Sequence, residues 1–225
     1  MILTNWSTLV RTIRFAYVAD AIQAASNTAN FVMSLSPGQQ LIVPALVQFM
    51  RDRGVPGIGP AGPTYAGALF ATVDSGDFSG IGLGARTSIR GGGGNYGVFY
   101  SAVPNGTAAN TSAWLCGLQQ NAENRTNLAL VNTGETGGTP DLFTIEIFDG
   151  DTGQKVKVVE EIPVNARVWK QFGSILNAYA PETRQGYARV TRTAGTNPFV
   201  AYVVINDGGQ PGERTGDGAF VPSSP

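Results

Sequence analysis

Histidine is absent from the 225-residue chain, and cysteine occurs once, at Cys116. Without histidine the chain cannot build a Ser-His-Asp or Cys-His catalytic site, or use an imidazole as general base or zinc ligand. A single cysteine cannot form a disulfide within the chain. Because no histidine can help to ionise its thiol, we expect Cys116 to be a small buried hydrophobic side chain.

Charge is scarce and nearly balanced. Only 14% of the residues are charged, with 15 basic and 16 acidic side chains, whereas roughly 25% is typical of soluble domains. Nucleic acids and anionic membrane surfaces attract an excess of positive charge, so we expect neither as a partner. No apolar run approaches the roughly 18 residues of a membrane-spanning helix. The glycine-rich, weakly charged composition is typical of extracellular bacterial proteins, so we expect a secreted protein. The N-terminus has no signal-peptide features, and we expect the chain to be a segment of something longer.

The chain contains two copies of one sequence pattern. The matching segments, in the same order in both copies, are residues 3–5 with 130–132, 12–15 with 144–147, 35–38 with 162–165, 67–76 with 186–195, and 97–99 with 218–220. We therefore expect a first repeat over residues 1–104, a linker with an extra strand over 105–124, and a second repeat over 125–225.

The pattern within each copy predicts strands. Apolar and polar residues roughly alternate in 143–147 and 187–192, as in half-buried strands, whereas 199–205 is apolar throughout, as in a central strand. Short strands separated by Gly, Asn and Pro turns are typical of a sandwich. Short helical turns fit residues 45–50 and 172–176. The predicted fold is all-β, with two tandem, internally repeated β-sandwich domains and short helical turns.

The first copy is expected to lack one strand. Residues 113–118 are expected to form an extra strand ahead of the second copy, whereas no such segment precedes Leu3 in the first. A sheet without its edge strand exposes unpaired backbone groups. A neighbouring copy of the chain, or another part of the parent protein, could then pair with this edge by strand addition. The alternative is that other elements of the first copy close the sheet.

Four segments carry a resemblance to a known family: residues 113–118, 125–132, 198–207 and 218–222. They resemble an uncharacterised tandem Ig-like β-sandwich module found toward the C-termini of large secreted bacterial proteins of acidobacterial type. The family module usually begins with a further strand ahead of the Leu-Thr-Asn step at Leu3. The resemblance implies a secreted location and a sandwich architecture, and it implies no chemistry.

Acidic residues offer two candidate sites. Asp149 and Asp151 have the spacing with which a turn presents oxygens to calcium, although a hairpin turn explains the same residues, and we expect no other cofactor. Glu146, Asp149 and Asp151 are also near enough in sequence for an Asp/Glu-dependent glycoside hydrolase. The pair at 160–161 is excluded from that role, because neighbouring residues in a regular strand point to opposite faces. No catalytic residue can be assigned.

Exposed aromatic side chains offer a third candidate site, since they form stacking surfaces for sugar rings in polysaccharide-binding proteins. Trp169 has polar neighbours, and Tyr179 and Trp6 are further candidates, although aromatic residues in β proteins more often fill the core. The leading hypothesis is a non-catalytic extracellular structural, adhesive or assembly module. A carbohydrate-binding accessory module and a glycoside hydrolase are the alternatives.

Overall fold

The structure, a computed structural model, describes residues 1–20, 28–59, 66–91, 94–214, 216 and 218–224. Most of these residues form antiparallel strands, so the predicted all-β fold is confirmed. The described helices are short, α1 (Leu46–Asp52) and α2 (Ile175–Tyr179). Two compact units can be separated: unit 1 is Met1–Arg86 with Tyr100–Ala102, and unit 2 is Thr87–Phe99 with Val103–Pro225. None of the helices in the described ranges is long and apolar enough to cross a membrane.

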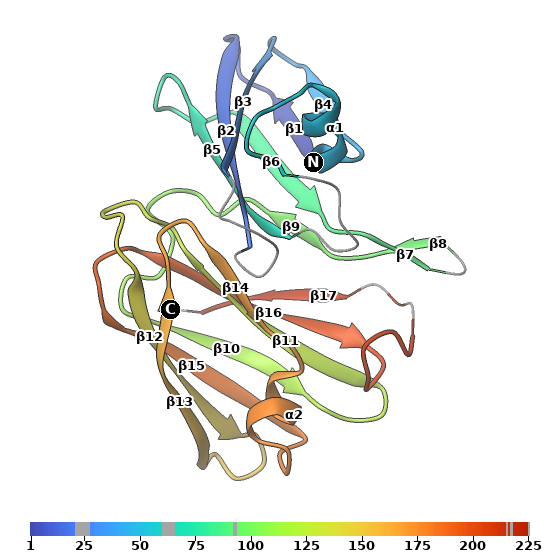
Figure 1. Ribbon diagram of the computed structural model, residues 1–225, viewed down its shortest axis with the longest axis vertical. Coiled ribbons are helices and arrows are strands. Elements are labelled where there is room, and N and C mark those ends of the chain that lie inside the picture. The colour runs from blue at the N-terminus through green and yellow to red at the C-terminus, as the bar shows by residue number, and fades with distance from the viewer. Residues whose placement is uncertain (21–27, 60–65, 92–93, 215, 217, 225) are drawn as a thin grey trace. The chain divides into compact units, whose positions relative to one another are not determined.

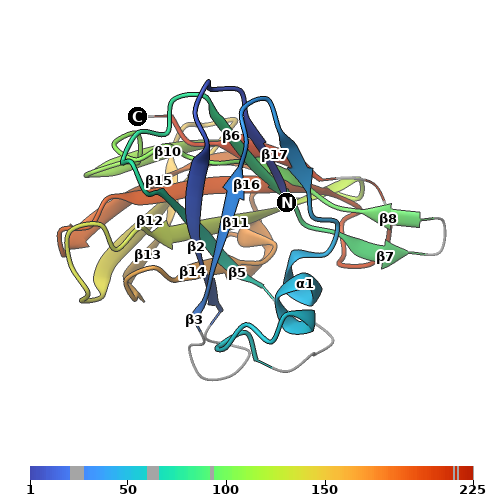
Figure 2. The same ribbon diagram turned by 90° about the horizontal axis from the view of Figure 1, so that it is seen from above.

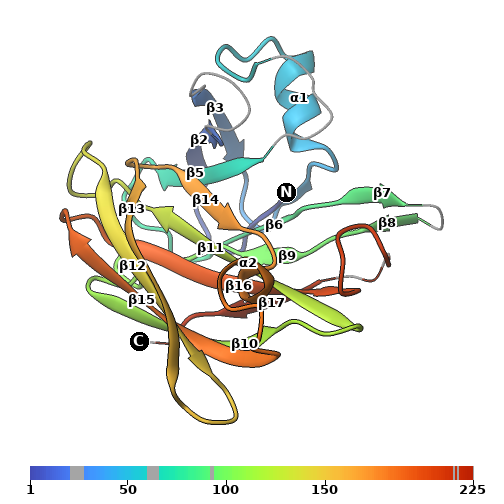
Figure 3. The same cartoon turned by 60° about the horizontal axis from the view of Figure 1, so that its bottom comes forward.

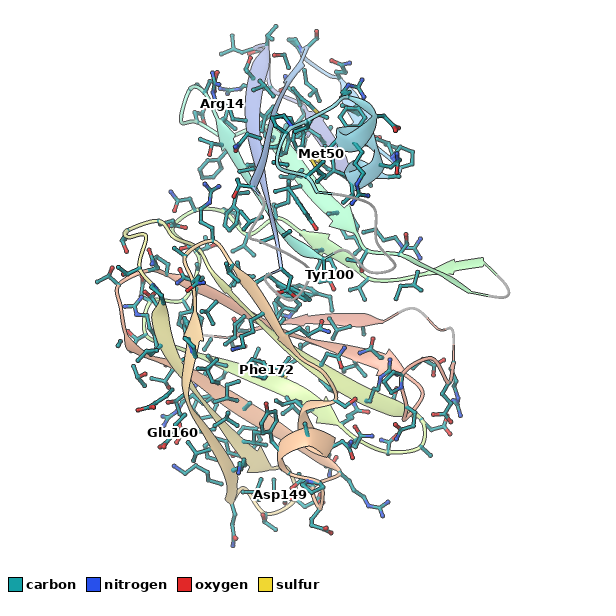
Figure 4. The ribbon with its side chains drawn as sticks, viewed as in Figure 1. Arg14, Met50, Tyr100, Asp149, Glu160 and Phe172 are labelled. Carbon is teal, nitrogen blue, oxygen red and sulfur yellow. The ribbon has the colours of Figure 1, made fainter. Side chains whose placement is uncertain are left out.

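Unit 1 has a four-stranded and a three-stranded sheet (Figures 1 and 2). The order of the first is β4 (Gln40–Ile42), β1 (Ile2–Asn5), β6 (Ile81–Arg86) and β9 (Phe99–Ser101), and that of the second is β3 (Thr28–Leu35), β2 (Arg11–Ala19) and β5 (Gly67–Val73). Leu3 of β1 and Phe15 of β2 are buried in one core, where Phe15 stacks on Phe31 with ring centroids 4.8 Å apart. Helix α1 buries Met50, labelled in Figure 4, against the same unit.

Unit 2 has two four-stranded sheets (Figure 3). One has the order β14 (Trp169–Phe172), β11 (Asn124–Asn132), β16 (Phe199–Asp207) and β17 (Ala219–Pro222), and the other has β10 (Ser112–Gln119), β15 (Gln185–Ala194), β12 (Asp141–Asp149) and β13 (Lys155–Val164). Their inner faces share one core that includes Leu115, Leu130 and Phe143. A separate hairpin of β7 (Ile89–Gly91) and β8 (Gly94–Tyr96) flanks residues 92–93, which lie outside the described ranges.

The strand order of unit 1 repeats in unit 2. The corresponding strands are β1 and β11, β4 and β14, β6 and β16, β9 and β17, β2 and β12, β3 and β13, and β5 and β15. Each corresponding pair of strands has the same neighbours in its own sheet. Strand β10 is the exception, because no strand in the described part of unit 1 corresponds to it.

A buried asparagine fixes this correspondence residue by residue. Asn5 and Asn132 are both fully buried at the ends of β1 and β11. The Nδ2 group of Asn5 donates to the carbonyl oxygen of Leu35 at 3.0 Å, and that of Asn132 donates to the carbonyl oxygen of Val164 at 2.9 Å. Each Oδ1 accepts from the backbone N–H two residues later, at 3.0 Å in both units. The Leu-x-Asn step of the sequence thus ties the two sheets of each sandwich together.

Two of the sequence matches are wrong by two residues. Since Leu35 corresponds to Val164, residues 35–38 match 164–167, and Gly38 and Arg167 both have left-handed backbones, with φ of 73° and 64°. Strand β2 begins opposite Leu35 and β12 opposite Val164, so residues 12–15 match 142–145. A shift of two residues keeps every side chain on the same face of a strand, so the alternating pattern cannot detect it.

Candidate functional site

The most unusual feature of unit 1 is the open edge of its three-stranded sheet. Strand β5 pairs with β2 on one side, and no strand in the described ranges pairs with its other side. The strand contains neither a charged residue nor a proline, which are the usual means of keeping an edge strand from pairing. Long apolar edges of this kind are ready templates for another strand.

The edges of the corresponding sheet in unit 2 are blunted. Strand β10 carries a bulge between Leu115 and Leu118, and its Trp114 exchanges backbone hydrogen bonds with Ser224 at 2.8 and 2.9 Å. On the opposite edge, β13 has two irregularities in its pairing and contains Pro163. Both devices interrupt a further ladder of hydrogen bonds. The edge of β5 has neither.

Strand β10 also closes the core of unit 2. Its Ala113, Leu115 and Leu118 have 0–1% of their surface exposed. Besides pairing with β15, β10 packs against β16 of the facing sheet. Behind it, Val190 and Phe199 are fully buried. The strand is therefore an integral part of the sandwich.

The corresponding positions of unit 1 are less covered. Ala71 of β5 lies opposite Phe15 as Val190 lies opposite Ile145, yet Ala71 is exposed. Ile81 and Leu83 of β6 correspond to Phe199 and Ala201, and both are only partly buried. These side chains lie where a strand equivalent to β10 would cover them. The inner surface of unit 1 is therefore only partly covered beside this edge of β5, which no described strand pairs with.

The three aromatic candidates come from different elements of the fold. Trp169 on β14 donates from its indole nitrogen to the hydroxyl of Tyr202 at 2.7 Å. Tyr179 on α2 packs edge-on against Phe172, with ring centroids 6.2 Å apart, and Figure 4 shows Phe172 in the interior of unit 2. Trp6 belongs to unit 1, where it is 64% exposed and lies against Gly82. Their role in sugar binding stays a prediction.

The calcium candidates lie in the hairpin turn between β12 and β13. Oδ1 of Asp149 accepts hydrogen bonds from the backbone N–H and the hydroxyl of Thr152, at 2.8 and 2.9 Å, and these bonds lower the pKa of Asp149. Asp151 accepts from the amide of Gln185 instead. No group of three His, Cys, Asp or Glu side chains in the described ranges is arranged to hold a metal. Asp149 thus stabilises the turn.

The glutamates are placed differently from one another. Glu146 on β12 is nearly buried and forms ion pairs with Lys155, at 2.7 Å, and with Arg189; the hydrogen bond from Lys155 is the largest cause of its lowered pKa. The expectation that residues 160 and 161 point to opposite faces is wrong. Both are exposed, because a bulge in β13 separates Val159 from Ile162, which both face the core. Figure 4 shows Glu160 on the outer side of the sandwich.

The predicted burial of Cys116 is also wrong, since its side chain is exposed. Leu115 pairs with Ala188 and Leu118 with Gly186, so Cys116 and Gly117 together lie opposite Tyr187. This is the bulge of β10, and Gly117 adopts a φ of +79° there. An extra residue re-aims the side chains next to it. The sequence alone gives no signal of this bulge except the glycine.

Comparison with known protein families, curated proteins and solved structures finds no match for this chain. The resemblance to the acidobacterial Ig-like module therefore stays a prediction.

Proposed function

We propose that this chain is a non-catalytic structural module of a secreted bacterial protein, in which unit 1 receives a strand from a binding partner. The observation that carries the proposal is the absence of a β10 counterpart in the described part of unit 1, next to the exposed Ala71. In the corresponding sandwich of unit 2, β10 pairs with β15, the counterpart of β5. The strand that unit 1 receives would take the place of β10. Strand addition to an exposed sheet edge is a common mode of protein recognition.

The partner segment should resemble β10. It runs antiparallel to β5, as β10 does to β15, and it presents apolar side chains at alternate positions to the uncovered surface over Ile81 and Leu83. Burying two leucines in this way contributes about 3–6 kcal/mol, at 1.5–3 kcal/mol each. Each backbone hydrogen bond to β5 adds about 1 kcal/mol. Ordering a flexible segment offsets part of this gain.

A second copy of the chain fits this surface less well than a separate donor segment. Two β5 strands could pair edge to edge, but Leu69 and Val73 of each strand already pack into their own core. Such a dimer would leave Ile81 and Leu83 as exposed as they are in one copy. A donor strand fills both the edge and the inner surface, so we favour a donor over self-association.

The ionic arrangement of the acidic side chains supports a role without catalysis. Glu146 is held between two cations, and Asp149 is bonded to the turn that contains it. A general acid for glycoside hydrolysis needs a raised pKa, whereas the pKa values of Glu146 and Asp149 are lowered. The hydrolase alternative thus gains no support from these residues.

A peptide with the β10 sequence tests the proposal. Fluorescence anisotropy would measure binding of residues 112–119, with Cys116 replaced by serine, to the chain and to two variants. Ala71→Asp places a charge on the uncovered inner face of β5, and we expect it to weaken binding at least tenfold. Thr72→Asp adds the same charge one residue later, on the opposite face, and should change binding less than threefold.

Three results would contradict the proposal. The first is that the peptide fails to bind, and the second is that a scrambled peptide binds equally well. The third is that Ala71→Asp and Thr72→Asp weaken binding to the same extent. Sedimentation velocity without peptide tests the other occupant, a second copy of the chain: a dimer that the β10 peptide dissociates would favour pairing between copies through β5.

A further inference from the structure

An aromatic cluster lies on the outer face of the sheet that contains β10, β15 and β12. Phe148 and Tyr187 stack almost parallel, with ring centroids 4.9 Å apart, and Trp114 lies 5.8 and 6.0 Å from them. Each ring comes from a different strand, and Trp114 is 37% exposed. The guanidinium of Arg189 lies 5.3 Å from the centre of the Trp114 ring. The result is an accessible aromatic surface that is built from three strands of unit 2.

A hollow of about 280 Å³ lies beside this cluster, with Tyr187 as part of its wall. The bulge at Cys116 and Gly117 forms one side, and the glycines at 150 and 186 contribute no side chains. Its volume lies just below the range for small-molecule sites, which begins at about 300 Å³. The space suits a single ring of a larger ligand rather than a whole cofactor.

Two of the polar side chains that line the hollow are amides. Gln119 and Gln185 line it, and the Oε1 of Gln185 accepts no hydrogen bond from the residues that the structure describes, while its Nε2 donates to Asp151. The carboxylate of Asp151, which is bonded to Gln185, disfavours an anionic ligand, and Glu146 is paired with Lys155 and Arg189. Amides offer both donors and acceptors. The ligand that matches them is neutral and carries several hydroxyl groups.

We infer that this hollow binds one ring of a neutral pyranose oligosaccharide. The apolar C–H face of the sugar packs on Tyr187, and its hydroxyls exchange hydrogen bonds with Gln119 and Gln185. Trp114 extends the aromatic surface beyond the hollow, so a neighbouring sugar unit continues over it. This site differs from the one predicted from the sequence, which used Trp169, Tyr179 and Trp6. It is also independent of strand addition at β5.

Cys116 provides a direct readout, because it is the chain's single cysteine, it is exposed, and it lines the hollow. The rate of its alkylation by iodoacetamide would be measured with cellohexaose, mannohexaose, xylohexaose and galactohexaose. We expect at least one of these to slow alkylation at least fivefold in a saturable manner. Tyr187→Ala and, separately, Gln119→Ala should remove this protection. Trp6→Ala, in unit 1, should retain it.

The inference is overturned if none of the four oligosaccharides protects Cys116, or if protection persists in both Tyr187→Ala and Gln119→Ala. Equal protection by all four, at concentrations that also slow alkylation of free cysteine, would likewise contradict a specific site. Gln119→Ala keeps the test valid if loss of the Tyr187 ring unfolds the sheet. Peptide binding at β5 is measured separately, so the two proposals fail independently.

Discussion

Replacing Asn132 with alanine should destabilise unit 2 strongly, although the substitution removes few atoms. Asn132 is fully buried, and its amide makes the contacts that tie β11 to the end of β13. Alanine leaves the carbonyl oxygen of Val164 without its donor, in a residue only 1% exposed. It also removes the acceptor of the Gly134 N–H group.

The magnitude follows from those two groups. A buried donor or acceptor left without a partner costs about 1–3 kcal/mol. The Val164 oxygen should account for most of the loss in unfolding free energy, because the bond to Gly134 is only part-buried. We therefore expect Asn132→Ala to lower the free energy of unfolding by about 2–4 kcal/mol. Asn132→Asp keeps the acceptor and loses the donor, so it should not restore stability.

Urea unfolding, followed by tryptophan fluorescence and circular dichroism, measures this effect. Asn177→Ala is the matched control, since Asn177 is exposed on α2, and a change within about 0.5 kcal/mol is expected. A loss below about 1 kcal/mol for Asn132→Ala, or wild-type stability in Asn132→Asp, would refute the reasoning. Asn5→Ala should destabilise unit 1 by the same mechanism.

Three further predictions concern charged groups. Hydrogen bonds from Ser79, and then Arg11, lower the pKa of Asp77 from 3.8 to about 2. Ionised Asp77 therefore stabilises unit 1 above pH 3.8, and this stabilisation is lost as the pH falls toward 2. Over this interval the melting temperature of Asp77→Asn should fall less than that of the unchanged protein. Glu146→Gln should cost roughly 1 kcal/mol, because its half-exposed partners regain water, and 1 M salt should shrink the difference in urea unfolding; an unchanged stability would contradict this. Asp149→Ala should lower the melting temperature equally with calcium chloride and with a chelator. A larger effect in the presence of calcium would support the calcium site predicted from the sequence.

Much of the fold is predictable because it depends on local pattern. Alternation in 143–147 and the apolar run in 199–205 place β12 and β16, and the Gly-Asp turn at 149–153 places the hairpin connection from β12 to β13. The repeated Leu-x-Asn step marks the same position in both sandwiches, since only a buried amide can bond both neighbouring segments there. The extra strand at 113–118 is recognisable as a short apolar segment ahead of the second copy.

The features that the sequence does not reveal depend on how a strand pairs with its neighbour in the sheet. The bulges at Cys116 and at residues 160–161 arise where two strands have unequal lengths between fixed contacts. The sequence of one strand does not show how long the neighbouring segment is. The exposure of Cys116 and the hollow beside it therefore cannot be derived from the alternation of apolar and polar residues. Similarly, the contact of Trp114 with Phe148 and Tyr187 requires the register of three strands.

Hydrogen exchange at β5 tests the central claim most directly. Met1 corresponds to Leu128, so residues 112–127 grafted ahead of Met1 would supply unit 1 with its own copy of β10 and the following turn. We expect the graft to slow amide exchange in Gly67–Val73 at least tenfold. A graft in which the copied Leu115 is replaced by aspartate should give no protection. If β5 exchanges equally fast with and without the intact graft, unit 1 does not accept a strand there, and the proposed function is wrong.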